Sequence, residues 1–270
     1  MINRITQRMQ ALKEANRKAL VTYIVSGDPT PDVTLNAIQE LVAKGADIIE
    51  LGIPFSDPMA EGPVIQRGHE RALAHHVSLK STLALVKQFR ETDNETPVVL
   101  MGYANPVERM GYSEFATAAF AAGVDGVLTV DLPPEEAVGL NKALRNVGLQ
   151  NIFLLSPTTT VQRIRDIASL ASGFVYYVSL KGVTGAGHLD LGSVKDKLGH
   201  IRQYTDLPIC VGFGIKDGNS ANAVAEYADG AVVGSVFVDK MGTLENESSQ
   251  TIVQAIGQLA AEIRYGLDGY

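Results

Sequence analysis

Two acidic residues stand where they could transfer protons. Glu50 interrupts an apolar run, Ile48–Gly52, and Glu61 lies in the loop that follows. Burial disfavours the charged form of a carboxyl group and raises its pKa, so Glu50 becomes a candidate general acid or base near neutral pH. The alternative is a structural Glu50 that pairs with a buried cation or hydroxyl group.

The loop that carries Glu61 is rich in proline. Residues 53–63 include Pro54, Pro58 and Pro63, and they also carry Asp57. A stiff loop would hold its carboxylates in fixed positions beside Glu50, which suits paired acid and base chemistry. The competing interpretation is a solvated acidic loop that caps a helix beginning near Gly62.

Glycines follow the last three apolar runs of the chain. Three of them lie in residues 179–190, which we predict to be a mobile lid. The later ones include Gly214 and Gly234, and a short helical turn is predicted from Ser235. Glycines let backbone N–H groups approach an anion, and the start of a helix adds partial positive charge, so we predict a phosphate site. The alternative is that these glycines only permit tight turns.

These candidate sites are spaced along a chain that alternates Val- and Ile-rich runs with longer amphipathic stretches, as repeated βα units do. We predict strands at Leu20–Val25, Ile48–Leu51, Val98–Met101, Gly126–Val130, Ile152–Leu155, Phe174–Val178, Ile209–Gly212 and Gly230–Val233. We predict helices at Arg4–Ala15, Pro31–Lys44, Leu79–Glu91, Tyr112–Ala122, Pro134–Asn146, Thr160–Ala171, Leu191–Gln203, Ser220–Tyr227 and Ser249–Tyr265.

Eight such units favour an α/β fold, a single (β/α)8 TIM barrel spanning residues 1–270 as one domain. The helix at Arg4–Ala15 would be an addition that plugs the lower end, and a short phosphate-binding helix would follow strand eight. Recurrent junctions such as Gly45-Ala46-Asp47 and Gly123-Val124-Asp125 support this interpretation, since each closes a helix before a strand. The alternative is an open doubly wound sheet, which usually binds phosphate after its first strand.

Composition narrows the class of protein. The net charge is -7 with scattered basic residues, which argues against nucleic-acid binding, and the single cysteine, Cys210, excludes a disulfide framework. The five histidines are not spaced for a metal site, so we expect no metal. Without a signal segment or an apolar run of about 20 residues, we expect no membrane association and a cytoplasmic location.

A specific resemblance joins these observations. The run Glu50–Pro58, followed by Gly62-Pro63 and Ile65-Gln66, resembles the signature of the tryptophan synthase alpha chain family. Further matching segments are Gly27-Asp28-Pro29, Met101-Gly102-Tyr103-Ala104-Asn105-Pro106, Asp131-Leu132-Pro133, Gly182-Val183-Thr184-Gly185 and Gly212-Phe213-Gly214-Ile215.

The resemblance implies a carbon–carbon lyase of tryptophan biosynthesis that cleaves indole-3-glycerol phosphate to indole and glyceraldehyde 3-phosphate by a retro-aldol reaction. Glu50 would move the protons, and Glu61 would face the indole nitrogen. The indole pocket would be lined by Tyr23, Met101, Leu128, Val130, Leu154, Tyr176 and Phe213. Phosphate would bind at Gly185, Gly214, Gly234 and Ser235. Thr184 would order the closed lid.

The resemblance also implies a partner. The family's alpha chain docks on a beta chain in an alpha2beta2 heterotetramer, under allosteric control, and indole passes through a tunnel to pyridoxal phosphate in the beta chain. This chain would itself hold no cofactor. Pro54, Asp57, Asn105 and Pro133 lie in loops that resemble those facing the beta chain.

Three positions depart from the family pattern. Glu61 replaces an expected Asp, Tyr23 stands where an apolar aromatic is common, and Gly102 stands where a larger residue is common. Three hypotheses therefore stay open: a working lyase subunit, a weak catalyst that mainly activates its beta partner, and another phosphate-binding barrel such as a sugar-phosphate isomerase. The strand-two motif argues against the third.

Overall fold

The strands form a closed barrel. The computed structural model describes residues 2–178, 191–212 and 214–269. Within them, eight parallel strands pair in chain order, and the first pairs with the last. The strands are β1 (Ala19–Val25), β2 (Ile48–Gly52), β3 (Val98–Gly102), β4 (Gly126–Thr129), β5 (Gln150–Leu155), β6 (Val175–Val178), β7 (Ile209–Gly212) and β8 (Gly230–Val233). The predicted TIM barrel is confirmed, and the open-sheet alternative is wrong.

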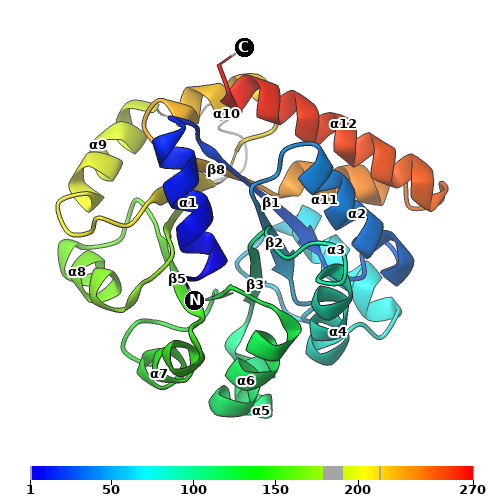
Figure 1. The fold of residues 1–270 in the computed structure, drawn as a ribbon, viewed down its shortest axis with the longest axis horizontal. Helices are drawn as coiled ribbons and strands as arrows, with labels where there is room; N and C mark the ends of the chain where they lie inside the picture. The colour runs from blue at the N-terminus through cyan, green and yellow to red at the C-terminus, as the bar shows by residue number, and fades with distance from the viewer. Residues whose placement is uncertain (1, 179–190, 213, 270) are drawn as a thin grey trace.

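Helices surround the barrel, and one further helix, α1, lies across its end (Figure 1). They are α1 (Arg4–Glu14), α2 (Pro31–Ala43), α3 (Pro63–Ala74), α4 (Leu79–Phe89), α5 (Ala104–Met110), α6 (Tyr112–Ala122), α7 (Val138–Val147), α8 (Val161–Leu170), α9 (Leu191–Ile201), α10 (Gly218–Ala225), α11 (Ser235–Thr243) and α12 (Ser249–Leu267). The sequence did not predict α5. Helix α7 begins at Val138 rather than Pro134, because residues 134–137 form turns.

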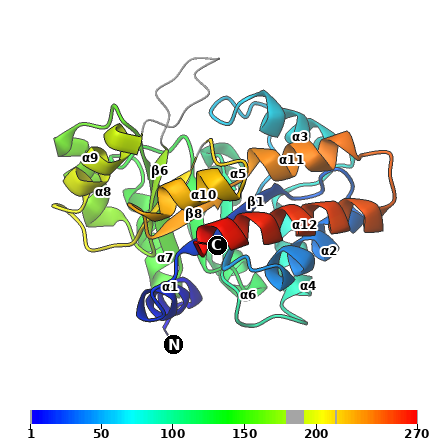
Figure 2. The ribbon, with the colours of Figure 1, turned by 90° about the horizontal axis from the view of Figure 1, so that it is seen from above.

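Helix α1 closes the end of the barrel at which the strands begin, which we call the barrel start. Its apolar face places Ile5, Met9 and Leu12 in one buried cluster with Ala19 of β1 and Val99 of β3. Figure 2 shows α1 at the lower end of the molecule, on the opposite side from α3 and α11. The predicted plug is therefore confirmed.

The Gly-x-Asp junctions are structural at the barrel start. Gly45 and Gly123 have positive φ angles of 100° and 90°, which glycine adopts without a steric penalty. Asp47 and Asp125 of these junctions, and Asp229 of the similar junction Tyr227-Ala228-Asp229, each accept a backbone N–H from near the start of a neighbouring strand, at 2.9, 2.9 and 2.8 Å. Each carboxylate thereby connects a helix-to-strand junction to the sheet.

The strand register brings Glu50 to the opposite end of the barrel, which we call the mouth. Glu50 pairs in register with Tyr23 of β1 and Val99 of β3. Side chains alternate between the two faces of a strand, so Glu50 shares the inward face of Ile48, which lies in the cluster beneath α1. Glu50 therefore lies inside the barrel, one layer nearer the mouth than Ile48.

Candidate active site

A cavity of about 340 Å³ opens at the mouth of the barrel. It lies where the functional sites of such barrels are found. The residues predicted from the sequence that line it are Tyr23, Glu50, Glu61, Met101, Val130, Leu154, Tyr176, Gly214, Gly234 and Ser235. Five strands, the segments that follow β2, β4, β7 and β8, and the first residue of α11 thus converge on one site, although the residues are spread over more than two hundred positions of the chain.

Four predicted residues are not part of this described lining. Leu128 is fully buried one layer below Val130, in the cluster that α1 closes, so it supports the floor of the cavity without facing it. Alternation along β4 explains this, since residues two apart point to the same side but at different depths. Thr184, Gly185 and Phe213 lie outside the described residues, as does the predicted lid at 179–190.

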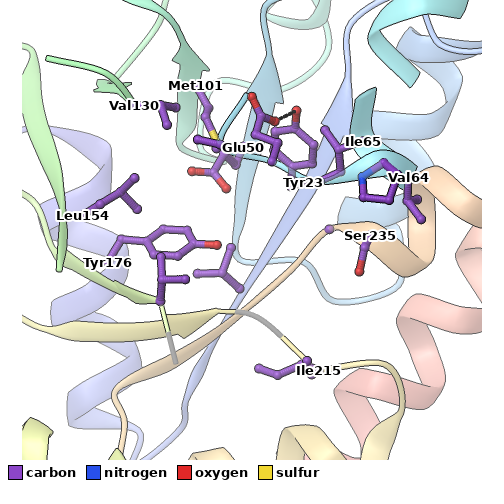
Figure 3. Close-up of a pocket in the computed structure, with 18 residues that line it drawn as sticks. Tyr23, Glu50, Val64, Ile65, Met101, Val130, Leu154, Tyr176, Ile215 and Ser235 are labelled. Carbon is purple, nitrogen blue, oxygen red and sulfur yellow. Dashed lines mark hydrogen bonds between the residues drawn. The ribbon is translucent and has the colours of Figure 1, made fainter. Parts of the chain in front are cut away.

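Glu50 is buried without a hydrogen-bond partner. Its exposure is 1%, and among the described residues no group hydrogen-bonds to either carboxyl oxygen. Burial first, and then the charge of Glu61, raise the pKa of Glu50 from 4.5 to about 8. Figure 3 shows its carboxyl group extending into the cavity, toward the space that Tyr176 also faces. Glu50 therefore carries a proton at neutral pH and can donate it to a bound molecule.

Two phenol groups lie in the same cavity wall. Burial, and then the charge of Glu61, raise the pKa of Tyr23 well above its ordinary value. Burial, and then the charge of Glu50, do the same for the pKa of Tyr176. Both phenols keep their protons across the physiological pH range, so each acts as a hydrogen-bond donor there.

His69 is the polar residue of this region that the sequence analysis missed. It lies on α3, is 1% exposed, and its Nε2 is 3.4 Å from Glu61 Oε2 and 3.3 Å from the Tyr23 hydroxyl oxygen. The Tyr23 hydroxyl donates to Glu61 Oε2 at 2.8 Å. The signal was helical spacing: a helix beginning at Pro63 places His69 on the same buried face as Ala72.

The loop that carries Glu61 is fixed by aromatic contacts. The rings of Phe55 and Tyr103 stack with centroids 4.9 Å apart, and the Tyr103 hydroxyl accepts the Ala60 N–H at 3.2 Å. Burial, and then the charge of Glu61, raise the pKa of Tyr103. The predicted stiff loop is thus held by packing at its middle as well as by its prolines.

Apolar side chains complete the cavity wall. Val64 and Ile65, from the first turn of α3, line the cavity together with Ile215 and Val232. From the sequence, the region after Gly62 was interpreted as the possible start of a helix, and Ile65 was part of the family signature, but neither Val64 nor Ile65 was predicted to line the site. A wall of this kind binds a flat apolar ring and keeps water away from it.

One side of the cavity is suited to an anion. Gly214 has a positive φ of 80°, Gly234 is the N-cap of α11, and Ser235 is its first residue. No Lys or Arg is found among the described residues that line the cavity. Backbone N–H groups, the Ser235 hydroxyl and the positive end of α11 would therefore hold an anion at this place.

The residues predicted to face a partner lie on the segments that follow β2, β3 and β4. Asp57 and Asn105 are exposed, Pro133 is partly buried and Pro54 is buried. Asn105 lies in α5 and not in a loop, because the chain turns helical directly after β3. Met59, in the same loop as Asp57, is 81% exposed. These segments form adjoining parts of one rim, because β2, β3 and β4 are neighbours in the barrel.

Two classes of feature are not found in the described part of the chain. No three His, Cys, Asp or Glu side chains there are grouped so that they could hold a metal ion. No helix among those residues is long and apolar enough to cross a lipid bilayer.

Comparison with known proteins shows which family the chain belongs to. The model of the tryptophan synthase alpha chain family matches residues 9–264. The chain belongs to the tryptophan synthase alpha chain family. The resemblance inferred from the sequence is therefore confirmed, together with the expectation of a lyase component in tryptophan biosynthesis. The sugar-phosphate isomerase alternative is wrong.

Individual members of this family are similar to this chain over nearly their whole length. The tryptophan synthase alpha chain of Thioalkalivibrio sulfidiphilus (strain HL-EbGR7) is 56% identical over 267 residues, which cover 99% of this chain and 100% of that protein. The alpha chain of Burkholderia cenocepacia (strain HI2424) is 55% identical over 268 residues, covering 99% and 98%. The crystal structure of tryptophan synthase subunit alpha from Legionella pneumophila str. Paris superposes with a TM-score of 0.93 at 45% identity, covering 100% of both chains.

Proposed function

We propose that the chain, acting as one TIM-barrel domain, cleaves indole-3-glycerol phosphate to indole and glyceraldehyde 3-phosphate by a retro-aldol reaction. The observation that carries this proposal is Glu50. It is a protonated carboxyl group with no partner of its own among the described residues, and it faces an apolar cavity. Burying such a group costs stability, and a proton donor to carbon is the chemistry that it supplies.

The reaction needs two proton transfers at neighbouring atoms. A proton must reach the ring carbon of indole that is released, and the adjacent glycerol hydroxyl must lose its proton as the aldehyde forms. Glu50 begins protonated, because its pKa is raised to about 8. It can therefore donate first to the carbon and, once ionised, accept the hydroxyl proton. One side chain serves as acid and then as base.

Glu61 would stabilise the positive charge that develops on the indole ring. Protonation at the ring carbon moves positive charge to the ring nitrogen, whose N–H then donates more strongly to a carboxylate. Val64, Ile65 and Met101 would hold the ring between the two carboxyl groups. Glu61 keeps the negative charge of the expected Asp, and its longer side chain is bonded to Tyr23.

The phosphate group of the substrate would bind at the opposite side of the cavity. Gly214, Gly234 and Ser235 line it there, and no Lys or Arg lines the cavity among the residues that the structure describes. A Cβ at position 234 would lie 3.1 Å from the Cβ of Tyr23, so glycine also keeps this approach open. We keep Thr184, Gly185 and Phe213 as predicted contacts of the substrate.

We further propose a beta chain as the partner, in an alpha2beta2 heterotetramer located in the cytoplasm. The pyridoxal phosphate would belong to the beta chain, and this chain would need no cofactor. Exposed Asp57, Met59 and Asn105 on adjoining parts of the rim support a docking surface close to the cavity. An apolar product could then pass to the partner without entering water.

The test is indole release from indole-3-glycerol phosphate, measured with the purified chain alone and with a beta chain added. We expect slow release that rises when the partner is present. No release in either case, together with faster condensation of serine and indole by the beta chain, would contradict the lyase and make the chain an activator. The replacement of Asp by Glu61 is the sequence feature that keeps this second function open.

A further inference from the structure

Two polar side chains, Tyr23 and His69, converge on one carboxylate oxygen of Glu61 in the cavity wall. Glu61 Oε2 accepts from the Tyr23 hydroxyl at 2.8 Å and lies 3.4 Å from His69 Nε2. The side chains of Glu61 and His69 are 3% and 1% exposed, and Tyr23 is equally buried. A carboxylate held this closely away from water has one defined orientation.

The backbone fixes which nitrogen of His69 carries the proton. The Phe55 N–H donates to His69 Nδ1 at 3.0 Å, so Nδ1 must present a lone pair. A neutral imidazole then carries its proton on Nε2, which is the atom that faces Glu61 and Tyr23. The Tyr23 hydroxyl uses its own proton on Glu61, so its oxygen is free to share the Nε2–H with Glu61 Oε2.

The position of the imidazole ring is itself fixed by helix packing. His69 lies on the buried face of α3 beside Gly68. A Cβ on Gly68 would approach Val238 of α11 to 2.8 Å, so this face of α3 packs tightly against α11. The imidazole ring is therefore held in place by α3, and its Nε2 in turn restrains the carboxylate of Glu61.

We propose that His69 is a positioning residue, which together with Tyr23 holds Glu61 in the place where the family pattern has an Asp. The inference rests on the proposed function, because it assumes that Glu61 faces the indole nitrogen. Glutamate is longer than aspartate by one C–C bond, about 1.5 Å, and an unrestrained carboxylate would be misplaced by a comparable distance. These two contacts, with the Tyr103 phenol that also interacts with Glu61, restrict that freedom, so Glu61, Tyr23 and His69 act as one unit.

Two substitutions of His69 separate positioning from structural support. His69→Asn keeps an acceptor near Nδ1 for the Phe55 N–H and removes the donor to Glu61. His69→Gln places a donor near Nε2 and removes the acceptor for Phe55. We expect His69→Asn to lower kcat about 10- to 100-fold with KM little changed, as for a lost hydrogen bond to a charged group that matters in the transition state.

The conservative variant and a control complete this comparison. His69→Gln should retain at least about tenfold more kcat than His69→Asn, although it loses the bond from Phe55. His75→Asn, at the exposed C-terminal end of the same helix, should cleave at the parent rate. A merely structural His69 would give the opposite order, with the Gln variant more impaired than the Asn variant.

The dependence on Glu61 can be tested by combining substitutions. In the otherwise unchanged chain, Glu61→Asp should lower kcat, because the shorter side chain does not reach its two partners. In the Tyr23→Phe, His69→Asn background, the same change should cost less or restore activity. An equal loss of kcat in both backgrounds would contradict the proposal that Glu61, Tyr23 and His69 act as one unit.

A measurement without substrate tests the tautomer. With ¹⁵N-labelled histidine, NMR should show His69 unprotonated at Nδ1 and protonated at Nε2. A proton on Nδ1 would overturn the inference. A parent chain that releases no indole contradicts the proposed function, whereas an active parent with an unaffected His69→Asn variant contradicts the positioning role alone.

Discussion

The two ends of the barrel bury carboxyl groups in opposite ways. At the barrel start, the Asp125 carboxylate accepts from the Val98 N–H at 2.9 Å, from Arg90 at 2.8 Å and from Arg4 at 3.0 Å. At the mouth, Glu50 is buried as deeply, and no described residue hydrogen-bonds to it. The same fold therefore contains a fully paired carboxylate and an unpaired carboxyl group.

Their electrostatics differ accordingly. Burial also raises the pKa of Asp47 at the barrel start, but the Leu20 N–H and the Arg264 guanidinium act against it. For Glu50, Glu61 is the charged neighbour that contributes among the described residues, and it raises the pKa further. The partners of Asp47 offset part of the cost of burying its carboxylate, whereas Glu50 has no such partner among the described residues and gains a proton that it can donate. Carboxylates with hydrogen-bond partners thus lie at the barrel start, and the carboxyl group proposed to transfer protons lies at the mouth.

The largest expected effect is the loss of catalysis in Glu50→Gln. An amide of similar shape keeps the packing but cannot move a proton, so kcat for indole release should fall by about 10²- to 10⁴-fold or more. Circular dichroism should show an unchanged fold. A variant that cleaves at the parent rate would contradict the role of Glu50 at the mouth.

The same substitution should change how stability depends on pH. The pKa of Glu50 is about 8 in the folded chain and 4.5 ordinarily. The unfolded chain thus releases this proton at lower pH than the folded chain does. The contribution of Glu50 to the free energy of unfolding is fully present below pH 4.5 and is lost as the pH rises to about 8. Relative to the parent, Glu50→Gln should gain about 1.4 kcal/mol in unfolding free energy per pH unit across that window.

Urea unfolding of both proteins at several pH values measures this difference. Above pH 8 the difference should level off, because Glu50 is then ionised in both states. A difference that stays constant from pH 4.5 to 8 would mean that Glu50 titrates normally and is not a proton donor at neutral pH. The measurement needs no substrate, so it tests the mouth separately from the reaction.

Much of this contrast could be predicted from the sequence. The period of apolar runs gave the strands, and a carboxyl group inside β2 pointed to Glu50, because both signals are local. The Gly-x-Asp junctions were recognised as helix ends, but their carboxylates bond to strands 20 to 27 residues away. Local patterns do not contain those pairings.

The same limit explains what was missed in the site. His69 and Glu61 are eight residues apart, and their contact depends on how the loop after β2 folds back against the buried face of α3. Leu128 was predicted to line the pocket, yet only its depth along β4 separates it from Val130. Depth is set by the stagger of strands around the closed barrel, which emerges from all eight strands together.

A smaller effect is expected from breaking the paired carboxylate at the barrel start. Asp125→Ala removes the 2.8 Å ion pair of the Arg90 guanidinium, which is 8% exposed and keeps Asp93 at 3.9 Å, and should cost about 3 kcal/mol of unfolding free energy. The turnover of the folded protein should stay at the parent value, since Asp125 lies at the far end from the cavity. A loss of kcat at unchanged stability would contradict the separation of the two ends.

The smallest effect is expected at the third junction of the same type. Asp229 accepts from the Ile209 N–H at 2.8 Å and from Arg202 at 2.9 Å, but the two side chains are 34% and 43% exposed. Water can replace the lost partner, so Asp229→Ala should cost about 1 kcal/mol in urea unfolding. Added salt should shrink this cost and leave that of Asp125→Ala nearly unchanged, because buried pairs are screened less. Equal costs at both junctions would show that the backbone N–H bond, which they share, matters more than burial of the ion pair.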